Sequence, residues 1–85
     1  MIRTNEHGQI VADDGITWQR DVRGFFSLSP RGYFIEFLER GSWEVFRKTT
    51  SSHPEKVPFV RQLIGRGSWR DCMRIAEIYE IRRRV

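Results

Sequence analysis

Cysteine is nearly absent from this sequence of 85 residues, since Cys72 is the only one. No disulfide can form within the chain, and small extracellular domains usually depend on disulfides, so we expect a reducing, intracellular environment. The first residues lack the apolar run of a secretory signal peptide, and no hydrophobic stretch approaches the roughly 20 residues of a membrane span. The sequence therefore predicts a soluble cytoplasmic protein that has no contact with membranes.

Histidine is also scarce, and the possible metal ligands are scattered. His7 and His53 lie far apart in polar segments, and one cysteine cannot supply a thiolate cluster, so we expect no metal site. Asp13 and Asp14 are adjacent in a turn signal, where successive side chains diverge and cannot act as a catalytic pair. Because the chain is also too short to enclose a deep pocket, we expect no enzymatic activity and no cofactor.

Lysine supplies only two of the 15 basic residues, and arginine supplies the other thirteen; with 11 acidic residues, the formal net charge is +4. A basic surface of this kind either serves solubility or binds an anionic partner, which would be nucleic acid or an acidic protein face. Arginine carries a planar fork of donors and is weakly hydrated, so it suits interfaces of both kinds better than lysine does.

The length allows one domain over residues 1–85, with no room for a second core. Aromatic residues are plentiful, with three Trp, six Phe and two Tyr. Most of them must lie in the core, because a domain of this size buries only roughly 60–65% of its surface. Residues 1–8 are polar, and we expect them to be flexible.

The clearest local signal is a β-hairpin. Residues 33–38 and 42–47 are rich in strand formers, and the three-residue loop between them ends in Gly41, where such a loop needs a left-handed backbone. This loop predicts the cross-strand pairs Phe37–Trp43, Ile35–Val45, Phe34–Phe46 and Glu36–Glu44. It assigns to the core the side that carries Tyr33, Ile35, Phe37, Trp43 and Val45. A two-residue loop would mix the apolar and charged faces, so we favour the longer one.

Further elements follow from shorter patterns. Strands are expected at residues 9–12, 16–20 and 25–28, while residues 59–64 fit either a last strand or a short helix. Gly65 and Gly67 are expected to interrupt the chain before a helix over about residues 69–83, which has Ser68 as N-cap and Asp71 in a capping box. Its apolar face consists of Trp69, Cys72, Met73, Ile75, Ala76 and Tyr79. These elements predict an α+β fold in which an antiparallel sheet of three to five strands packs on one C-terminal helix.

The other side of the hairpin is a candidate protein-binding surface. It carries apolar side chains beside charged ones, as many interaction sites do. The candidates are Phe34, Leu38, Phe46, Glu36, Glu44 and Lys48. We expect Lys48 or a nearby arginine to neutralise the facing carboxylates of Glu36 and Glu44. In the alternative, the N-terminal strands or residues 59–64 fold over this surface and bury it.

A second set of candidates could bind nucleic acid. It comprises the turn arginines and the basic C-terminal tail: Arg20, Arg23, Arg31, Arg40, Arg61, Arg66, Arg82, Arg83 and Arg84. If they cluster in space they would suit phosphates, whereas dispersed arginines would have no common role. The last three could equally serve only to stabilise the helix end, where cations complement the helix dipole.

A resemblance bears on both functions. Trp18, the run Gly32-Tyr33-Phe34-Ile35, the run Trp43-Glu44-Val45, and Ser68 opening a helix with Ala76-Glu77 form a pattern over residues 16–80. This pattern resembles small phage and prophage proteins, most of them uncharacterised. The order of three strands and a helix also resembles integrase arm-binding domains, which implies a sheet laid in the DNA major groove. Glu36 and Glu44 on such a sheet would repel phosphate.

We therefore expect a small non-enzymatic binding module that acts through protein–protein contact, such as an inhibitor or accessory protein encoded by a mobile element. The alternative is a nucleic-acid-binding domain that uses the turn arginines and the basic tail. Self-association into a homo-oligomer also remains open.

Overall fold

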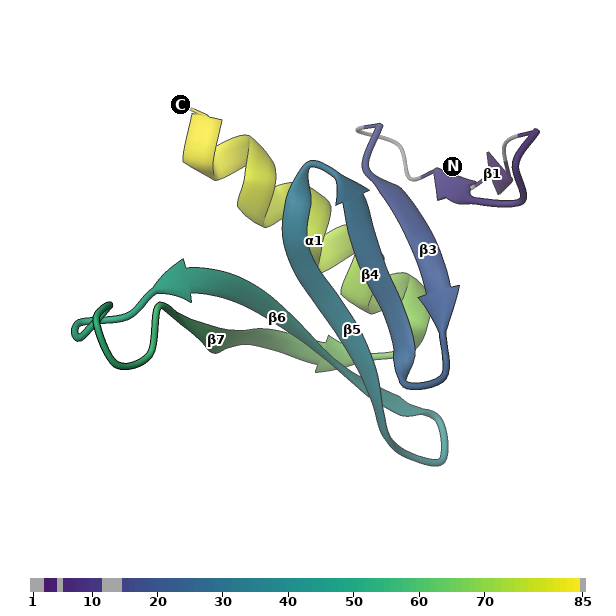
Figure 1. Ribbon diagram of the computed structural model, residues 1–85. Helices are drawn as coiled ribbons and strands as arrows, with labels where there is room; N and C mark the ends of the chain where they lie inside the picture. Colours follow the sequence, from purple (N-terminus) through teal and green to yellow (C-terminus); the bar gives the residue numbers. More distant parts are fainter. Residues whose placement is uncertain (1–2, 5, 12–14, 85) are drawn as a thin grey trace.

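The structure, a computed structural model, describes residues 3–4, 6–11 and 15–84 and shows one helix packed on one face of an antiparallel sheet (Figure 1). The sheet has seven strands in chain order, each paired with the next. The strands are β1 (Arg3–Thr4), β2 (Ile10–Val11), β3 (Thr17–Asp21), β4 (Gly24–Ser29), β5 (Arg31–Glu39), β6 (Ser42–Thr50) and β7 (Phe59–Gly67). The helix α1 (Trp69–Arg84) follows β7 directly. It is neither long enough nor apolar enough to cross a lipid bilayer.

The α+β class is confirmed. The expected three to five strands are too few, because further segments pair with the sheet at both of its edges. At one edge, β1 and β2 form a short ladder that includes part of the segment predicted to be flexible. At the other edge, the ambiguous residues 59–64 are strand and continue through Gly65 to Gly67. Asp13 and Asp14 lie outside the described residues.

Gly65 and Gly67 were expected to interrupt the chain before the helix, but both belong to β7. Their role is to let the helix approach the sheet closely. A Cβ on Gly65 would lie 2.7 Å from Cδ1 of Ile75, and one on Gly67 would lie 2.8 Å from Cβ of Asp71. The β6–β7 pairing has a bulge: Val45 pairs with Gly65 and Phe46 with Leu63, so Ile64 is the extra residue in β7. The glycines are thus positions of close packing.

The predicted hairpin register is confirmed, since all four cross-strand pairs occur between β5 and β6 and Gly41 has a φ of 75°. Tyr33, Ile35 and Val45 are fully buried. Phe37 was assigned to the core, and that assignment is wrong: it is 57% exposed. Its ring makes an edge contact with Trp43 at 5.3 Å, near the loop that ends the hairpin, where the helix no longer covers the sheet.

The core lies between α1 and the sheet. Its buried apolar side chains come from the middle strands and from one side of the helix: Ile16, Trp18, Phe25, Tyr33, Ile35, Val45, Cys72, Met73 and Ala76. Trp69, Ile75 and Tyr79 are partly buried against this cluster, as the helical pattern predicted. The N-cap is also confirmed, because Asp71 N donates to Ser68 Oγ at 3.1 Å and Ser68 N donates to Asp71 Oδ2 at 3.2 Å.

Candidate functional site

The face of the sheet opposite α1 has no covering layer among the described residues (Figure 1). The helix contacts β5, β6 and β7 from one side, and the N-terminal strands and β7 extend the sheet at its edges. The alternative in which one of these segments folds over the sheet is therefore wrong. We call this uncovered surface the open face.

A continuous row of apolar side chains crosses the open face. Phe26 in β4 pairs with Phe34 in β5, which pairs with Phe46 in β6, which pairs with Leu63 in β7. Directly paired residues on neighbouring strands have Cβ atoms about 5 Å apart, so the four side chains are contiguous. The three phenylalanines are partly buried and Leu63 is 43% exposed. We call this set the apolar row.

Two ion pairs lie beside the apolar row. Glu36 and Glu44 face each other across β5 and β6, as predicted, and each is paired with an arginine of β7. Arg61 bonds the Glu36 carboxylate, and Arg66 Nε donates to Glu44 Oε2 at 2.9 Å. The Arg61 guanidinium also lies over the Phe34 ring, 4.3 Å from its centroid. Arg61 and Arg66 rather than Lys48 therefore neutralise the carboxylates, and Arg61 also stacks on the apolar row.

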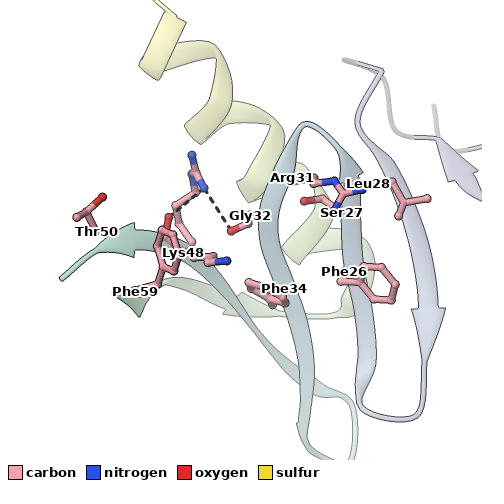
Figure 2. Close-up of a pocket in the computed structure, with 10 residues that line it drawn as sticks. Phe26, Ser27, Leu28, Arg31, Gly32, Phe34, Lys48, Thr50 and Phe59 are labelled. Atoms are coloured by element: carbon pink, nitrogen blue, oxygen red, sulfur yellow. Dashed lines mark hydrogen bonds between the residues drawn. The ribbon is translucent and has the colours of Figure 1, made fainter. Parts of the chain in front are cut away.

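A hollow of about 450 Å³ opens on the open face beside Phe26 and Phe34 of the apolar row (Figure 2). It lies where the far ends of β6 and β7 diverge from the β4–β5 hairpin. Its lining residues are Phe26, Ser27, Leu28, Arg31, Gly32, Phe34, Arg47, Lys48, Thr50 and Phe59. The lining thus combines three aromatic rings with three cations and includes no acidic residue.

Two of the cations in the hollow are held in place. Arg47 Nη1 donates to the carbonyls of Gly32 at 3.4 Å and Lys48 at 3.0 Å, and its guanidinium lies 4.9 Å from the Tyr33 ring centroid. Lys48 Nζ lies 4.0 Å from the centroid of the Phe59 ring. Cations seated on aromatic rings lose less freedom when they bind an anion than fully mobile side chains do.

Five of the six sequence candidates for protein binding lie together on one surface. Phe34, Phe46, Glu36, Glu44 and Lys48 share the open face. Leu38 is 48% exposed and lies near the loop that joins β5 and β6, away from the hollow.

Several residues of the site were missed by the sequence analysis: Phe26, Leu28, Arg47, Phe59 and Leu63. The alternation in residues 25–28 would have placed Phe26 and Leu28 together. The predicted register put Arg47 opposite Tyr33, on the helix side of the hairpin, so it gave no sign that Arg47 lines the hollow. Phe59 and Leu63 were hidden by the uncertainty over residues 59–64.

The arginines proposed for nucleic-acid binding do not form one cluster. Arg20, Arg23 and Arg40 lie at the end of the sheet that holds the β3–β4 and β5–β6 turns, and Arg31 lies at the opposite end. Arg61 and Arg66 were predicted in turns, but they lie in β7, where both are paired with glutamates. At the end of α1, Arg83 Nε bonds Glu80 Oε1 at 3.3 Å, while Arg82 is exposed on the same turn. The side chain of Arg84 lies outside the described part of the structure.

Two buried polar groups lie on the helix side of the sheet. Tyr33 Oη donates to Glu80 Oε1. Burial, the largest cause, and this hydrogen bond, the next largest, raise the pKa of Tyr33 well above its usual range. The Cys72 thiol donates to the Trp43 carbonyl at 3.4 Å, and burial raises the pKa of Cys72 to about 11. A thiol in this state is almost entirely protonated at neutral pH, so it is a poor nucleophile.

No family model, curated protein or solved structure matches this chain. Among residues 3–4, 6–11 and 15–84, no three His, Cys, Asp or Glu side chains gather as a metal ion would require.

Proposed function

We propose that this protein is a non-enzymatic binding module that recognises another protein through the open face. The apolar row of Phe26, Phe34, Phe46 and Leu63 is the observation that carries the proposal. Small domains have little apolar surface to bury, so rings left on an uncovered face forgo hydrophobic stabilisation within the chain. A partner that covers the row would recover it.

The composition of the open face supports a protein partner. Aromatic side chains and arginine are enriched at protein interfaces, and binding energy concentrates on such residues where they are packed and desolvated. Arg61 is held between the Glu36 carboxylate and the Phe34 ring before any partner arrives. Because such a side chain is already ordered, it adds little to the entropy cost of association. An inhibitor or accessory protein of the cytoplasm would act in this way.

Nucleic-acid binding is the second candidate, and the net charge of +4 favours it. Its support is weaker, because the arginines near the turns lie at opposite ends of the sheet. Arg61 and Arg66 lie in β7 and are paired with Glu36 and Glu44. A phosphate backbone laid along the open face would also approach those carboxylates.

The proposal is tested by comparing Phe34→Ala and Phe46→Ala with Phe37→Ala in affinity capture followed by quantitative mass spectrometry. Phe37 is the matched control, because it is an exposed phenylalanine of β5 on the opposite face of the sheet. Urea unfolding first establishes that each variant folds. We expect the same captured proteins to be lost from both open-face variants and retained by Phe37→Ala. An unchanged set of captured proteins would overturn the proposal.

A parallel measurement addresses the second candidate. Fluorescence anisotropy with labelled single- and double-stranded oligonucleotides, at salt between about 50 and 200 mM, reports any binding that depends on phosphate contacts. Affinity that falls steeply with salt would favour the nucleic-acid function over the protein-binding one. We expect no sequence-independent binding of this kind at the higher salt concentration.

A further inference from the structure

We infer that the hollow binds a segment of the protein partner in which an acidic side chain adjoins an aromatic or leucine side chain. This inference rests on the proposed function and specifies the chemistry of the partner.

The lining of the hollow is divided between apolar and cationic groups. Phe26, Leu28 and Phe34 form its apolar part on β4 and β5, and Phe59 adds a ring from β7 (Figure 2). Arg31, at the start of β5, also lines it. A ligand that fills the hollow must therefore carry both an apolar group and a group that accepts hydrogen bonds. Its volume of about 450 Å³ lies within the range typical of ligand sites.

The charge of the hollow is not balanced from within the described chain. Neither Arg31 nor Lys48 is ion-paired with an acidic residue that the structure describes. The carboxylates nearest along β5 and β6, Glu36 and Glu44, are already bonded to Arg61 and Arg66. An incoming carboxylate would thus meet cations without competing for a partner, and hydrogen bonds between ionised groups are the strong ones.

The ring faces favour a peptide over a base as the apolar ligand. The Arg61 guanidinium lies 4.3 Å from the Phe34 centroid, and Lys48 Nζ lies 4.0 Å from the Phe59 centroid. Nucleic-acid bases stack on free aromatic faces, and a cation already occupies one face of each of these two rings. An aliphatic or aromatic side chain needs only apolar contact, which the edges of these rings and Leu28 provide.

The test uses NMR, which detects weak binding, because a short peptide that fills only this hollow is expected to bind weakly. The labelled protein is titrated with the blocked tetrapeptide Glu-Phe-Glu-Leu, with its neutral analogue Gln-Phe-Gln-Leu, and with an oligonucleotide of four thymidines. We expect the acidic peptide to shift the amide signals of Phe34, Lys48 and Phe59, with at least tenfold higher affinity than the neutral analogue.

Three variants separate a local effect from one of net charge. Arg31→Glu and Lys48→Glu reverse a charge in the hollow, and Arg40→Glu makes the same reversal in the distant β5–β6 loop. We expect the first two to weaken binding of the acidic peptide at least tenfold and Arg40→Glu to change it less than twofold. Urea unfolding of each variant confirms that it is folded.

Other results overturn the inference. Equal affinity for the two peptides, no shift with either, or equal effects of all three variants would each do so. Shifts at the hollow with the oligonucleotide alone would identify nucleic acid as its occupant. In the capture experiment, partners lost with Phe46→Ala but retained with Lys48→Glu would leave the proposed function standing without this site.

Discussion

The hydroxyl of Tyr33 in β5 donates a hydrogen bond of 2.7 Å to Oε1 of Glu80 in α1, across 47 positions of the sequence. Glu80 is only 6% exposed, and Arg83 contacts the same oxygen. A buried carboxylate is tolerated only when it is hydrogen-bonded or paired, so this contact fixes how the C-terminal half of the helix sits on the sheet. The same tyrosine ring carries Arg47, which lines the hollow.

Removing the Tyr33 hydroxyl should destabilise the fold. In Tyr33→Phe the buried Glu80 carboxylate loses a donor, so we expect the free energy of unfolding to fall by about 1–3 kcal/mol in urea titrations. Tyr79→Phe is the control, because Tyr79 is a partly buried neighbour whose ring meets Tyr33 edge-on at 6.1 Å. Equal losses from the two variants would show that the Tyr33–Glu80 bond adds no particular stability.

Gly24 should tolerate no side chain. Its φ is 148°, and a Cβ would lie 2.1 Å from the carbonyl oxygen of Ile35. We therefore expect Gly24→Ala to lower the free energy of unfolding by more than about 2 kcal/mol, because backbone strain and a backbone clash add. Gly41→Ala, at a φ of 75° with no atom within 4 Å of the new Cβ, should lose only about 1 kcal/mol. A similar loss at both positions would mean that the sheet adjusts freely around Gly24.

The capping box should contribute measurably to helix stability. Ser68→Ala removes the acceptor of the Asp71 N–H, and loss of such an N-cap costs about 1 kcal/mol. Ser52→Ala, in the exposed loop between β6 and β7, makes the same chemical change away from any helix. Thermal and urea unfolding of the two variants gives the comparison. If Ser68→Ala is no less stable than Ser52→Ala, the cap is dispensable.

Stability should fall above about pH 9 because of Cys72. Its pKa is about 11 in the native state against an ordinary value of 9.0, so between these values the unfolded chain has released a proton that the native chain keeps. The free energy of unfolding then decreases as pH rises, by at most about 1.4 kcal/mol per pH unit for one group. The raised pKa of Tyr33 acts in the same direction at still higher pH.

Urea titrations at about pH 8 and about pH 10 measure this effect. In Cys72→Ala the thiol contribution is gone, so the fall between the two pH values should be smaller than in the parent chain. An identical fall in both proteins would assign the pH dependence to other groups.

Much of the local structure could be predicted from the sequence because it depends on neighbouring residues. The hairpin register follows from the loop that ends in Gly41, and the start of the helix follows from Ser68 and Asp71. The burial of Phe37 was predicted wrongly, because it depends on tertiary structure. Alternation fixes the side of a strand on which a residue lies, but not whether the helix reaches far enough to cover it.

The sequence by itself determined the α+β class, the central hairpin, the two faces of that hairpin and the capped helix, since each arises from contacts over a few residues. Only the tertiary structure decided that residues 59–67 extend the sheet, that Arg61 and Arg66 meet Glu36 and Glu44, and that Arg31, Lys48 and Phe59 surround one hollow. These relationships join residues far apart in the chain. They depend on how the whole sheet curls around the helix, which no local pattern encodes.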